Sequence, residues 1–114
     1  MNEKVSIITP CYNGAKYIGE TIESVLAQDY KDWEMLIVND GSSDNSAEVI
    51  SSYAEKDPRI RLINQPNGGS ANARNNGIRQ ATGRYIALLD ADDLWNPDFL
   101  SEQLLFLKEK NAAV

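Results

Sequence analysis

The segment VSIITPCYNGAKYIGETIESVLAQ, residues 5–28, joins a strand pattern to a helix pattern. Its first part, residues 5–9, is rich in β-branched side chains and is followed by Pro10, which is typical of a buried strand that ends in a loop. From residue 16 to residue 28, apolar side chains recur at the spacing i, i+4, i+7 and i+8, which marks one face of a helix. The segment therefore predicts a strand, a loop over residues 10–15 and a helix.

The same order of patterns returns three times along the chain. Apolar runs at residues 33–38, 60–63 and 85–89 predict further strands, and each is followed by a polar turn and a helical pattern. Asp44 or a neighbouring serine is expected to cap the second helix, and Asn96, followed by proline, the last one. Near-continuous apolar strands that alternate with helices predict an α/β fold, a Rossmann-like parallel sheet with helices on both faces.

Composition bounds the class of protein. A chain of 114 residues without repeats or linkers is expected to form a single domain, residues 1–114. Its net charge of −6 argues against a general electrostatic affinity for nucleic acid or anionic membranes. The single cysteine, Cys11, excludes an intramolecular disulfide, and the absence of histidine excludes the usual zinc sites and histidine-based triads. The first apolar run is too short for a signal peptide or a membrane span, so we expect a cytoplasmic protein.

The polar loops that follow the strands are the expected ligand site. In an open parallel sheet, ligands bind at the carboxyl ends of the strands, near the point where the strand order reverses. These loops are rich in glycine and polar side chains, whereas the connections at the opposite end are ordinary charged turns. The loops cover residues 10–15, 39–44, 65–74 and 90–96.

Three carboxylates, Asp90, Asp92 and Asp93, follow the last predicted strand. In an extended backbone residues i and i+2 point the same way, so Asp90 and Asp92 can converge on one cation. Carboxylate oxygens suit Mg²⁺ or Mn²⁺, and such an ion would let an acidic domain hold a diphosphate. Spacing alone leaves an alternative open, in which these residues cap the next helix or form a solvated turn.

Three more residues are candidates for nucleotide binding, each with an ordinary structural alternative. Asp40 can accept hydrogen bonds from a base or ribose, or it can form an Asx-turn. Tyr12 can stack on a nucleobase, or it can pack on the neighbouring helix. Arg74, near a predicted helix start, can bind phosphate, or it can form a surface ion pair. The G-x-G-x-x-G and P-loop motifs are absent, which disfavours nicotinamide cofactors and P-loop phosphate transfer.

Four segments together resemble the amino-terminal half of the family 2 glycosyltransferases, which are inverting enzymes with the GT-A fold. The segments are VSIITPCYNGAKYIGETIESVLAQ, WEMLIVNDGSSD, NGGSANARNNGI and GRYIALLDADDLWNPDFL, in the family's order and spacing. The resemblance implies transfer of a sugar from a nucleotide diphosphate sugar to an acceptor hydroxyl. A UDP-sugar is the commonest donor for such a pocket, and the acceptor can be a glycan, a lipid-linked intermediate or a protein.

The resemblance assigns a base-binding role to one group of residues. Pro10 and Tyr12, with Thr9 nearby, would line the pocket for the nucleotide base. Asp40 would contact that base, and Arg74 would lie near the base or the diphosphate.

The D-x-D motif of the family matches a second group. Asp90 would lie near the ribose, and Asp92 would bind the Mn²⁺ or Mg²⁺ that bridges the diphosphate. Asp93 is a neighbour that could share this task. The resemblance and the residue chemistry thus agree on the ion and on the end of the sheet.

The catalytic base of the family, usually an aspartate, lies in the half that binds the acceptor, so we expect it beyond Val114. We therefore expect a chain truncated before the acceptor-binding half, and a full-length enzyme that can lie at the membrane periphery. The last helix carries Phe99, Leu100 and four apolar residues at 104–107, which cover more than one face. Either that helix is buried on two sides, or its cover is absent and favours a homo-oligomer.

Two alternatives from other classes stand beside this interpretation. A non-catalytic, Mg²⁺-binding α/β regulatory module would need acidic residues after the first strand, and residues 9–15 contain none. A metal-dependent nucleotidyltransferase usually has a glycine-rich, basic segment there, and only Gly14 and Lys16 are present.

Overall fold

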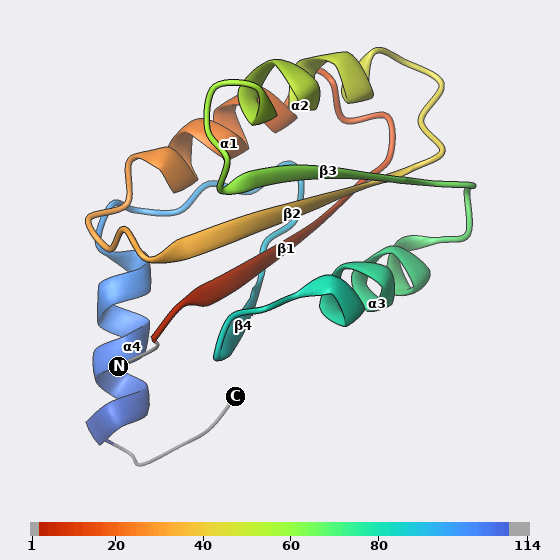
Figure 1. Ribbon diagram of the computed structural model, residues 1–114. Helices are drawn as coiled ribbons and strands as arrows, with labels where there is room; N and C mark the ends of the chain where they lie inside the picture. The colour runs from red at the N-terminus through yellow and green to blue at the C-terminus, as the bar shows by residue number, and fades with distance from the viewer. Residues whose placement is uncertain (1–2, 110–114) are drawn as a thin grey trace.

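The computed structural model describes residues 3–109, and in this range strands and helices alternate along the whole chain (Figure 1). The predicted α/β fold is confirmed. No helix in this part of the chain has the length and apolar character needed to span a membrane. The elements are β1 (Val5–Cys11), α1 (Ile18–Leu26), β2 (Trp33–Asp40), α2 (Ser46–Ala54), β3 (Ile60–Gln65), α3 (Ser70–Gln80), β4 (Tyr85–Leu88) and α4 (Phe99–Glu109).

The strands form one parallel sheet in the order β3-β2-β1-β4. The chain moves outward from β1 through β2 to β3 and then crosses to the other side of β1, so the strand order reverses between β1 and β4. β1 pairs with β2 along its whole length, but its pairing with β4 stops at Ile8 and Leu88. The two strands therefore separate at the place where an open parallel sheet binds its ligand.

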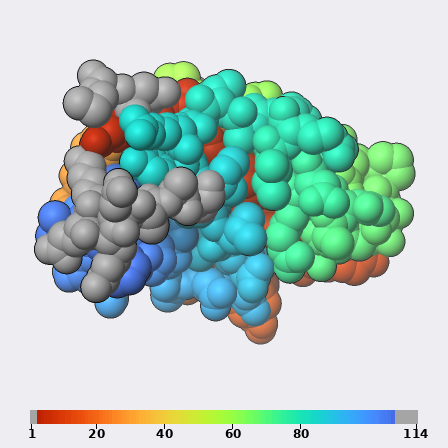
Figure 2. Space-filling model, turned by 90° about the horizontal axis from the view of Figure 1, so that it is seen from below, coloured from red at the N-terminus to blue at the C-terminus, as the bar shows by residue number. Residues whose placement is uncertain are grey.

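Helices cover both faces of the sheet. α1 and α2 lie on one face, α3 lies on the other, and α4 stands near the beginnings of β1 and β2 (Figure 1). The larger core, on the side of α1 and α2, includes Ile7, Ile22 and Met35, and α4 adds Leu100 and Leu104. Figure 2 shows α3 spread across the opposite face. Under α3 lies a smaller core of Ile8, Leu36, Val38, Ile63 and Ala73.

β1 continues through Pro10 to Cys11, so the prediction that the strand ends at Pro10 is wrong. Backbone groups of even-numbered residues in β1 point toward β4, as the bond from the Leu89 N–H to the Ile8 carbonyl (3.0 Å) shows. The missing N–H of Pro10 points the same way, where β4 has already ended. Proline is tolerated here because a backbone N–H at this position would find no acceptor on β4.

α4 begins at Phe99, so the prediction that Asn96 caps it and that Pro97 is its first residue is also wrong. The Asn96 carbonyl accepts a hydrogen bond from the Gln28 amide (2.7 Å), and the Pro97 carbonyl accepts one from the Asp29 N–H (2.8 Å). Both carbonyls hold the chain against the end of α1, and the Asn96 carbonyl also accepts from the Phe99 N–H (3.0 Å), which closes a turn directly before α4.

α4 buries one face and not two. Leu100 and Leu104 are 2% and 6% exposed, whereas Leu105 and Phe106 are 60% and 53% exposed. Burial on two sides, one of the two expectations for this helix, is therefore wrong within the described residues.

Candidate functional site

A cavity of about 320 Å³ opens where β1 and β4 separate. All four loops predicted to bind a ligand contribute to its wall. The lining residues are Pro10, Cys11, Tyr12, Asn13, Gly14, Tyr17, Asp40, Ser70, Asp90, Ala91 and Asp92. The structure thus brings together most of the residues that the sequence singled out, including Asp40, Asp90 and Asp92.

The first loop is tied to the loop after β2 through Asn13. This residue has a left-handed backbone (φ 50°), and its Oδ1 accepts hydrogen bonds from the N–H groups of Ser43 (2.8 Å) and Asp44 (3.3 Å). In return, the Asn13 N–H donates to the Ser42 hydroxyl (2.9 Å), and the Gly14 N–H donates to the Ser46 hydroxyl (3.0 Å). One wall of the cavity is thereby fixed. Sequence reasoning missed this role, although an Asn-Gly pair is a known signal for a left-handed turn.

Asp90 and Asp92 come together through a turn. The Asp93 N–H donates to the Asp90 carbonyl (3.1 Å), which closes a tight turn after β4. Both residues are exposed and line the cavity. They share one cavity, but a turn brings them there and not the alternation along an extended strand that the sequence suggested.

Polar side chains on α1 and just after its end hold this turn from behind. The Thr21 hydroxyl donates to the Ala91 carbonyl (2.7 Å), and the Trp95 N–H donates to the Ser24 hydroxyl (3.3 Å). Gln28, fully buried, donates to the Asn96 carbonyl and accepts from the Leu100 N–H (3.1 Å). The segment that carries both aspartates is thus bound to a rigid helix. The i, i+3, i+7 spacing of these polar residues is a helical signal, but the sequence does not show what they bind.

Asp40 lies at the end of β2 and is 3% exposed. Its Oδ1 accepts hydrogen bonds from the Gln65 amide (2.9 Å) and the Gly68 N–H (2.8 Å), and its Oδ2 accepts from the Gly69 N–H (3.0 Å). Burial alone would raise the pKa of Asp40, but these hydrogen bonds outweigh it and hold the pKa below its ordinary value. An ionised carboxylate, which can only accept hydrogen bonds, therefore faces the cavity.

Two aromatic side chains border the cavity. Tyr12 and Tyr17 are 57% and 50% exposed, so both rings offer a free surface. Lys16 holds its ammonium 5.7 Å from the centroid of the Tyr17 ring. Sequence reasoning proposed Tyr12 and missed Tyr17, which looked like an ordinary residue at a helix start.

Two proposed site residues do not line the cavity. Thr9 is fully buried in β1, and its hydroxyl has no hydrogen-bond partner among the described residues. Arg74 is half-buried on α3, one turn after Ser70, which does line the cavity. Within residues 3–109 the Arg74 guanidinium has no hydrogen bond or ion pair, so it is available to an anion beside the first turn of α3.

Cys11 lies in the cavity wall but is 1% exposed. Burial raises the pKa of its thiol, and the hydrogen bonds with Ser46 and Gly14 offset this only in part. A protonated, buried thiol is a poor nucleophile, so Cys11 is a packing residue in the cavity wall.

The donor set in the cavity fits a hard divalent cation. Asp90 and Asp92 line the cavity, and neither carboxylate forms a hydrogen bond or ion pair with the part of the chain that the structure describes. In the same part of the chain no cluster of three or more acidic or thiol side chains is arranged as a metal site. Two carboxylates are what Mg²⁺ or Mn²⁺ uses when phosphate and water supply its remaining ligands.

Comparison with known proteins gives a consistent result. The sequence model of "Glycosyl transferase family 2" matches residues 6–114. TuaG of Bacillus subtilis, whose name assigns it to teichuronic acid biosynthesis as a glycosyltransferase, is 44% identical over 110 residues, which is 96% of this chain and 44% of TuaG.

Two solved glycosyltransferase structures have the same fold. TarS 1–349 of S. aureus in complex with UDP-GlcNAc gives a TM-score of 0.86 at 32% identity, over 93% of this chain and 31% of that TarS chain. The mannosyltransferase PcManGT of Pyrobaculum calidifontis, in complex with GDP-Man and Mn²⁺, gives 0.83 at 31% identity, over 94% of this chain and 33% of PcManGT. The chain therefore spans less than half the length of these proteins.

Proposed function

We propose that this chain, which belongs to glycosyl transferase family 2, forms the donor-binding half of an inverting glycosyltransferase. Its cavity would hold a nucleotide diphosphate sugar together with Mn²⁺ or Mg²⁺. The observation that carries this proposal is the presence of Asp40 and of the pair Asp90 and Asp92 in one cavity, on the two sides of β1. Such a donor needs a group that binds its nucleobase at one end and carboxylates that bind a metal ion at its diphosphate end. Asp40 would serve the first purpose, and Asp90 and Asp92 the second.

The ligands of the structural relatives support this class of donor. TarS was solved with UDP-GlcNAc and PcManGT with GDP-Man and Mn²⁺, both nucleoside diphosphate sugars. Among these we favour a UDP-sugar for this chain. Family membership also favours a glycosyltransferase over a regulatory module or a nucleotidyltransferase.

The base end of the donor would lie over Pro10, beside the free ring of Tyr12. Asp40 would accept a hydrogen bond from an N–H of the base, since its lowered pKa keeps it ionised at neutral pH. Thr9 would support the floor of this pocket from inside the sheet, because it exposes no atom to the cavity. Arg74 would approach the base or the diphosphate from α3.

The phosphate end would lie at the turn after β4, where Asp92 and Asp90 would hold the ion and Asp90 would also lie near the ribose. When bound, the ion offsets the negative charge that grows on the diphosphate. In the transfer step, the acceptor oxygen bonds to the anomeric carbon, the bond from that carbon to the diphosphate oxygen breaks, and its electron pair stays on the diphosphate. A carboxylate base, which we place beyond Val114, takes the acceptor proton.

The acceptor and location follow from the relatives and are proposals for the full-length enzyme. The name of TuaG supports a polysaccharide of the cell envelope as the product, with a glycan, lipid-linked or protein acceptor. We place such an enzyme in the cytoplasm, where nucleotide sugars are supplied, and at the membrane periphery. The donor-binding half alone should transfer sugar poorly or not at all.

Calorimetric titration of UDP, with and without Mn²⁺, tests the proposal. We expect binding that depends on Mn²⁺ and that weakens by about tenfold or more in Asp92→Ala. Asp32→Ala is the matched control, because Asp32 is exposed at the opposite end of the sheet. Failure to bind UDP or any other nucleoside diphosphate under all metal conditions would refute the donor site, and equal binding by Asp92→Ala would refute its metal role.

A further inference from the structure

A continuous series of side-chain hydrogen bonds runs from the outer strand to the cavity. Arg61 on β3 donates to Gln80 Oε1 (3.1 Å), and the Gln80 amide donates to Asn76 Oδ1 (2.9 Å). The Asn76 amide donates to Gln65 Oε1 (2.9 Å), and the Gln65 amide donates to Asp40 Oδ1 (2.9 Å). We call Gln65, Asn76 and Gln80 the amide ladder.

The two ends of the amide ladder fix its direction. Arg61 can only donate, and the ionised Asp40 can only accept. Each amide between them must therefore accept on one side and donate on the other, so all three point the same way. The Gln65 amide, which donates to Asp40, cannot turn over unless Asn76 turns over with it. The orientation of Gln65 is therefore set by the next residues of the ladder.

The ladder also joins α3 to β3. The buried residues of this helix, Ala73 and Gly77, are small and let it lie close against β1 and β2, and the ladder adds polar contacts with β3. Asn76 and Gln80 lie one turn apart on α3, while Arg61 and Gln65 lie on the α3 face of β3, on either side of Ile63. The first turn of α3 borders the cavity at Ser70, so the ladder holds two parts of the cavity wall in register.

We propose that the amide ladder positions Asp40 so that one carboxylate oxygen remains available to a nucleobase, and that it thereby contributes to base specificity. Oδ1 is fully used by Gln65 and Gly68, whereas Oδ2 has one short partner, the Gly69 N–H, and a longer contact of 3.4 Å with Asn67. A carboxylate oxygen accepts about two hydrogen bonds, so a base N–H can bind Oδ2 in place of the long contact with Asn67, whose amide also donates to the Asp40 carbonyl (3.0 Å). This inference rests on the proposed function, and Gln65, Asn76 and Gln80 act as positioning residues through Asp40.

Asn76→Asp is the sharpest perturbation, because it changes the polarity of the ladder and almost nothing of its shape. A carboxylate at this position accepts only, so Gln65 must turn its amide toward residue 76 or leave two acceptors facing each other. In the first case Gln65 Oε1 faces the Asp40 carboxylate, and in both cases one hydrogen bond becomes a repulsive contact.

The experiment compares UDP with its N3-methyl analogue, which lacks the base N–H, in the presence of Mn²⁺. In the unmodified chain UDP should bind about tenfold better than the analogue. In Asn76→Asp the affinity for UDP should fall about tenfold while that for the analogue stays nearly the same, so the preference disappears. Arg79→Gln is the control, since it makes the same change in net charge on an exposed position of α3. A purely structural role would weaken both ligands equally and would overturn the proposal.

A second measurement needs no ligand and separates this proposal from the proposed function. The pKa of Asp40, followed by its carboxyl carbon signal in NMR, should rise in Asn76→Asp, because the hydrogen bond from Gln65 that lowers it is lost. If it does not move, the ladder does not position Asp40. If it rises but no form of the chain binds a nucleotide, the proposed function and the specificity role are both refuted. Asn76→Ala, which only interrupts the ladder, gives a smaller loss of base preference and keeps the test available should Asn76→Asp not fold.

Discussion

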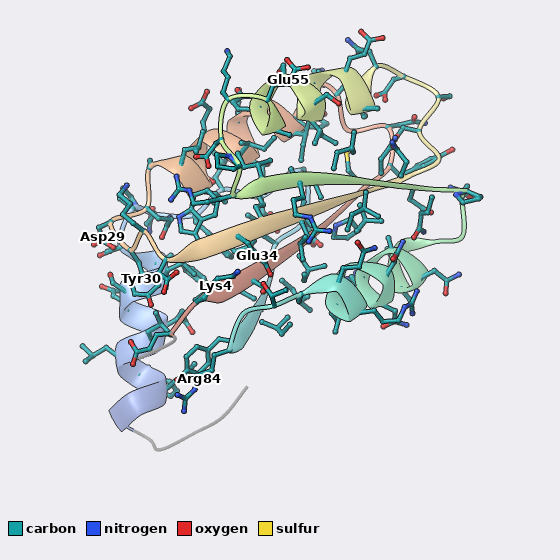
Figure 3. All side chains as sticks on the ribbon, viewed as in Figure 1. Lys4, Asp29, Tyr30, Glu34, Glu55 and Arg84 are labelled. Atoms are coloured by element: carbon teal, nitrogen blue, oxygen red, sulfur yellow. The ribbon has the colours of Figure 1, made fainter. Side chains whose placement is uncertain are left out.

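Glu34 and Asp40 are buried carboxylates on the same face of β2, one at each end of the strand. Asp40 serves the cavity, whereas Glu34 lies near the beginning of the strand, beside Lys4 (Figure 3). Glu34 accepts hydrogen bonds from the Ser6 hydroxyl (2.6 Å) and from the Thr82 N–H (2.7 Å), and its other oxygen lies 3.6 Å from Lys4 Nζ. It thereby ties the connection between α3 and β4 to the centre of the sheet.

Glu34 should make stability depend on pH on the acid side. Burial raises the pKa of Glu34, but the hydrogen bonds from Ser6 and Thr82 and the charge of Lys4 outweigh it, so the folded-state pKa lies below the ordinary value of 4.5. The stabilisation is therefore complete above about pH 4.5 and is lost as the pH falls through the folded pKa. We expect Glu34→Gln to lower the free energy of unfolding by about 1–3 kcal/mol at pH 7, measured by urea denaturation.

The same variant should flatten the acid limb of the stability profile. Glu55→Gln is the control, because Glu55 is exposed on the first turn after α2 (Figure 3) and its side chain forms no hydrogen bond or ion pair with the described part of the chain. We expect a change within about 0.5 kcal/mol. Parallel acid limbs for Glu34→Gln and the unmodified chain would show that Glu34 does not govern this dependence.

α3 packs closely against the sheet through a glycine, Gly77. A Cβ on Gly77 would lie 2.7 Å from Ile8 Cγ2 and 3.3 Å from Val38 Cγ2, both in the floor of the smaller core. From the sequence, Gly77 only weakens the predicted helix. The structure shows instead that the missing side chain allows α3 to lie against β1 and β2.

Gly77→Ala should therefore destabilise the protein despite its better helix propensity. We expect a loss of about 1–3 kcal/mol, since the added methyl forces the core apart. Gly19→Ala in α1 is the matched control, because a Cβ there would meet Tyr53 at 3.5 Å, an ordinary contact; this change should stabilise by about 0.5–1 kcal/mol. Thermal unfolding of the two variants gives the comparison, and equal shifts for both would contradict the close packing of α3.

Local patterns were sufficient to predict the elements, but not the contacts between distant segments. The period of apolar residues predicted each strand and helix, and the rule for parallel sheets placed Asp40, Asp90 and Asp92 at one edge. The end of β1 could not be predicted, because the effect of Pro10 depends on where β4 stops. The hydrogen bond between Thr21 and Ala91, across 70 positions, likewise requires the folded chain, as does the amide ladder.

The polar cavity and the apolar groove beside α4 lie at opposite ends of the sheet. The cavity occupies the carboxyl ends of the strands, while α4 stands near their beginnings (Figure 1). An apolar groove of about 240 Å³ lies between α4 and β4, lined among others by Tyr85, Trp95 and Leu104. Trp95 stacks on Phe99 with ring centroids 4.4 Å apart, so this aromatic belongs to the packing of α4 and not to the ligand cavity.

The exposed apolar residues of α4 should cause self-association of this chain. Leu105 and Phe106 are more than half exposed on adjacent positions, and Leu88 on the edge strand β4 is 55% exposed, so an apolar surface remains accessible to a second copy. We expect the sedimentation coefficient to rise with protein concentration, and Phe106→Glu to reduce this rise because it places a charge in the contact. Ile78→Glu on α3 is the control, since Ile78 is also exposed (41%) but lies on a different helix. A sedimentation coefficient that stays monomeric at high concentration, or that responds equally to both variants, would show that α4 does not mediate the association.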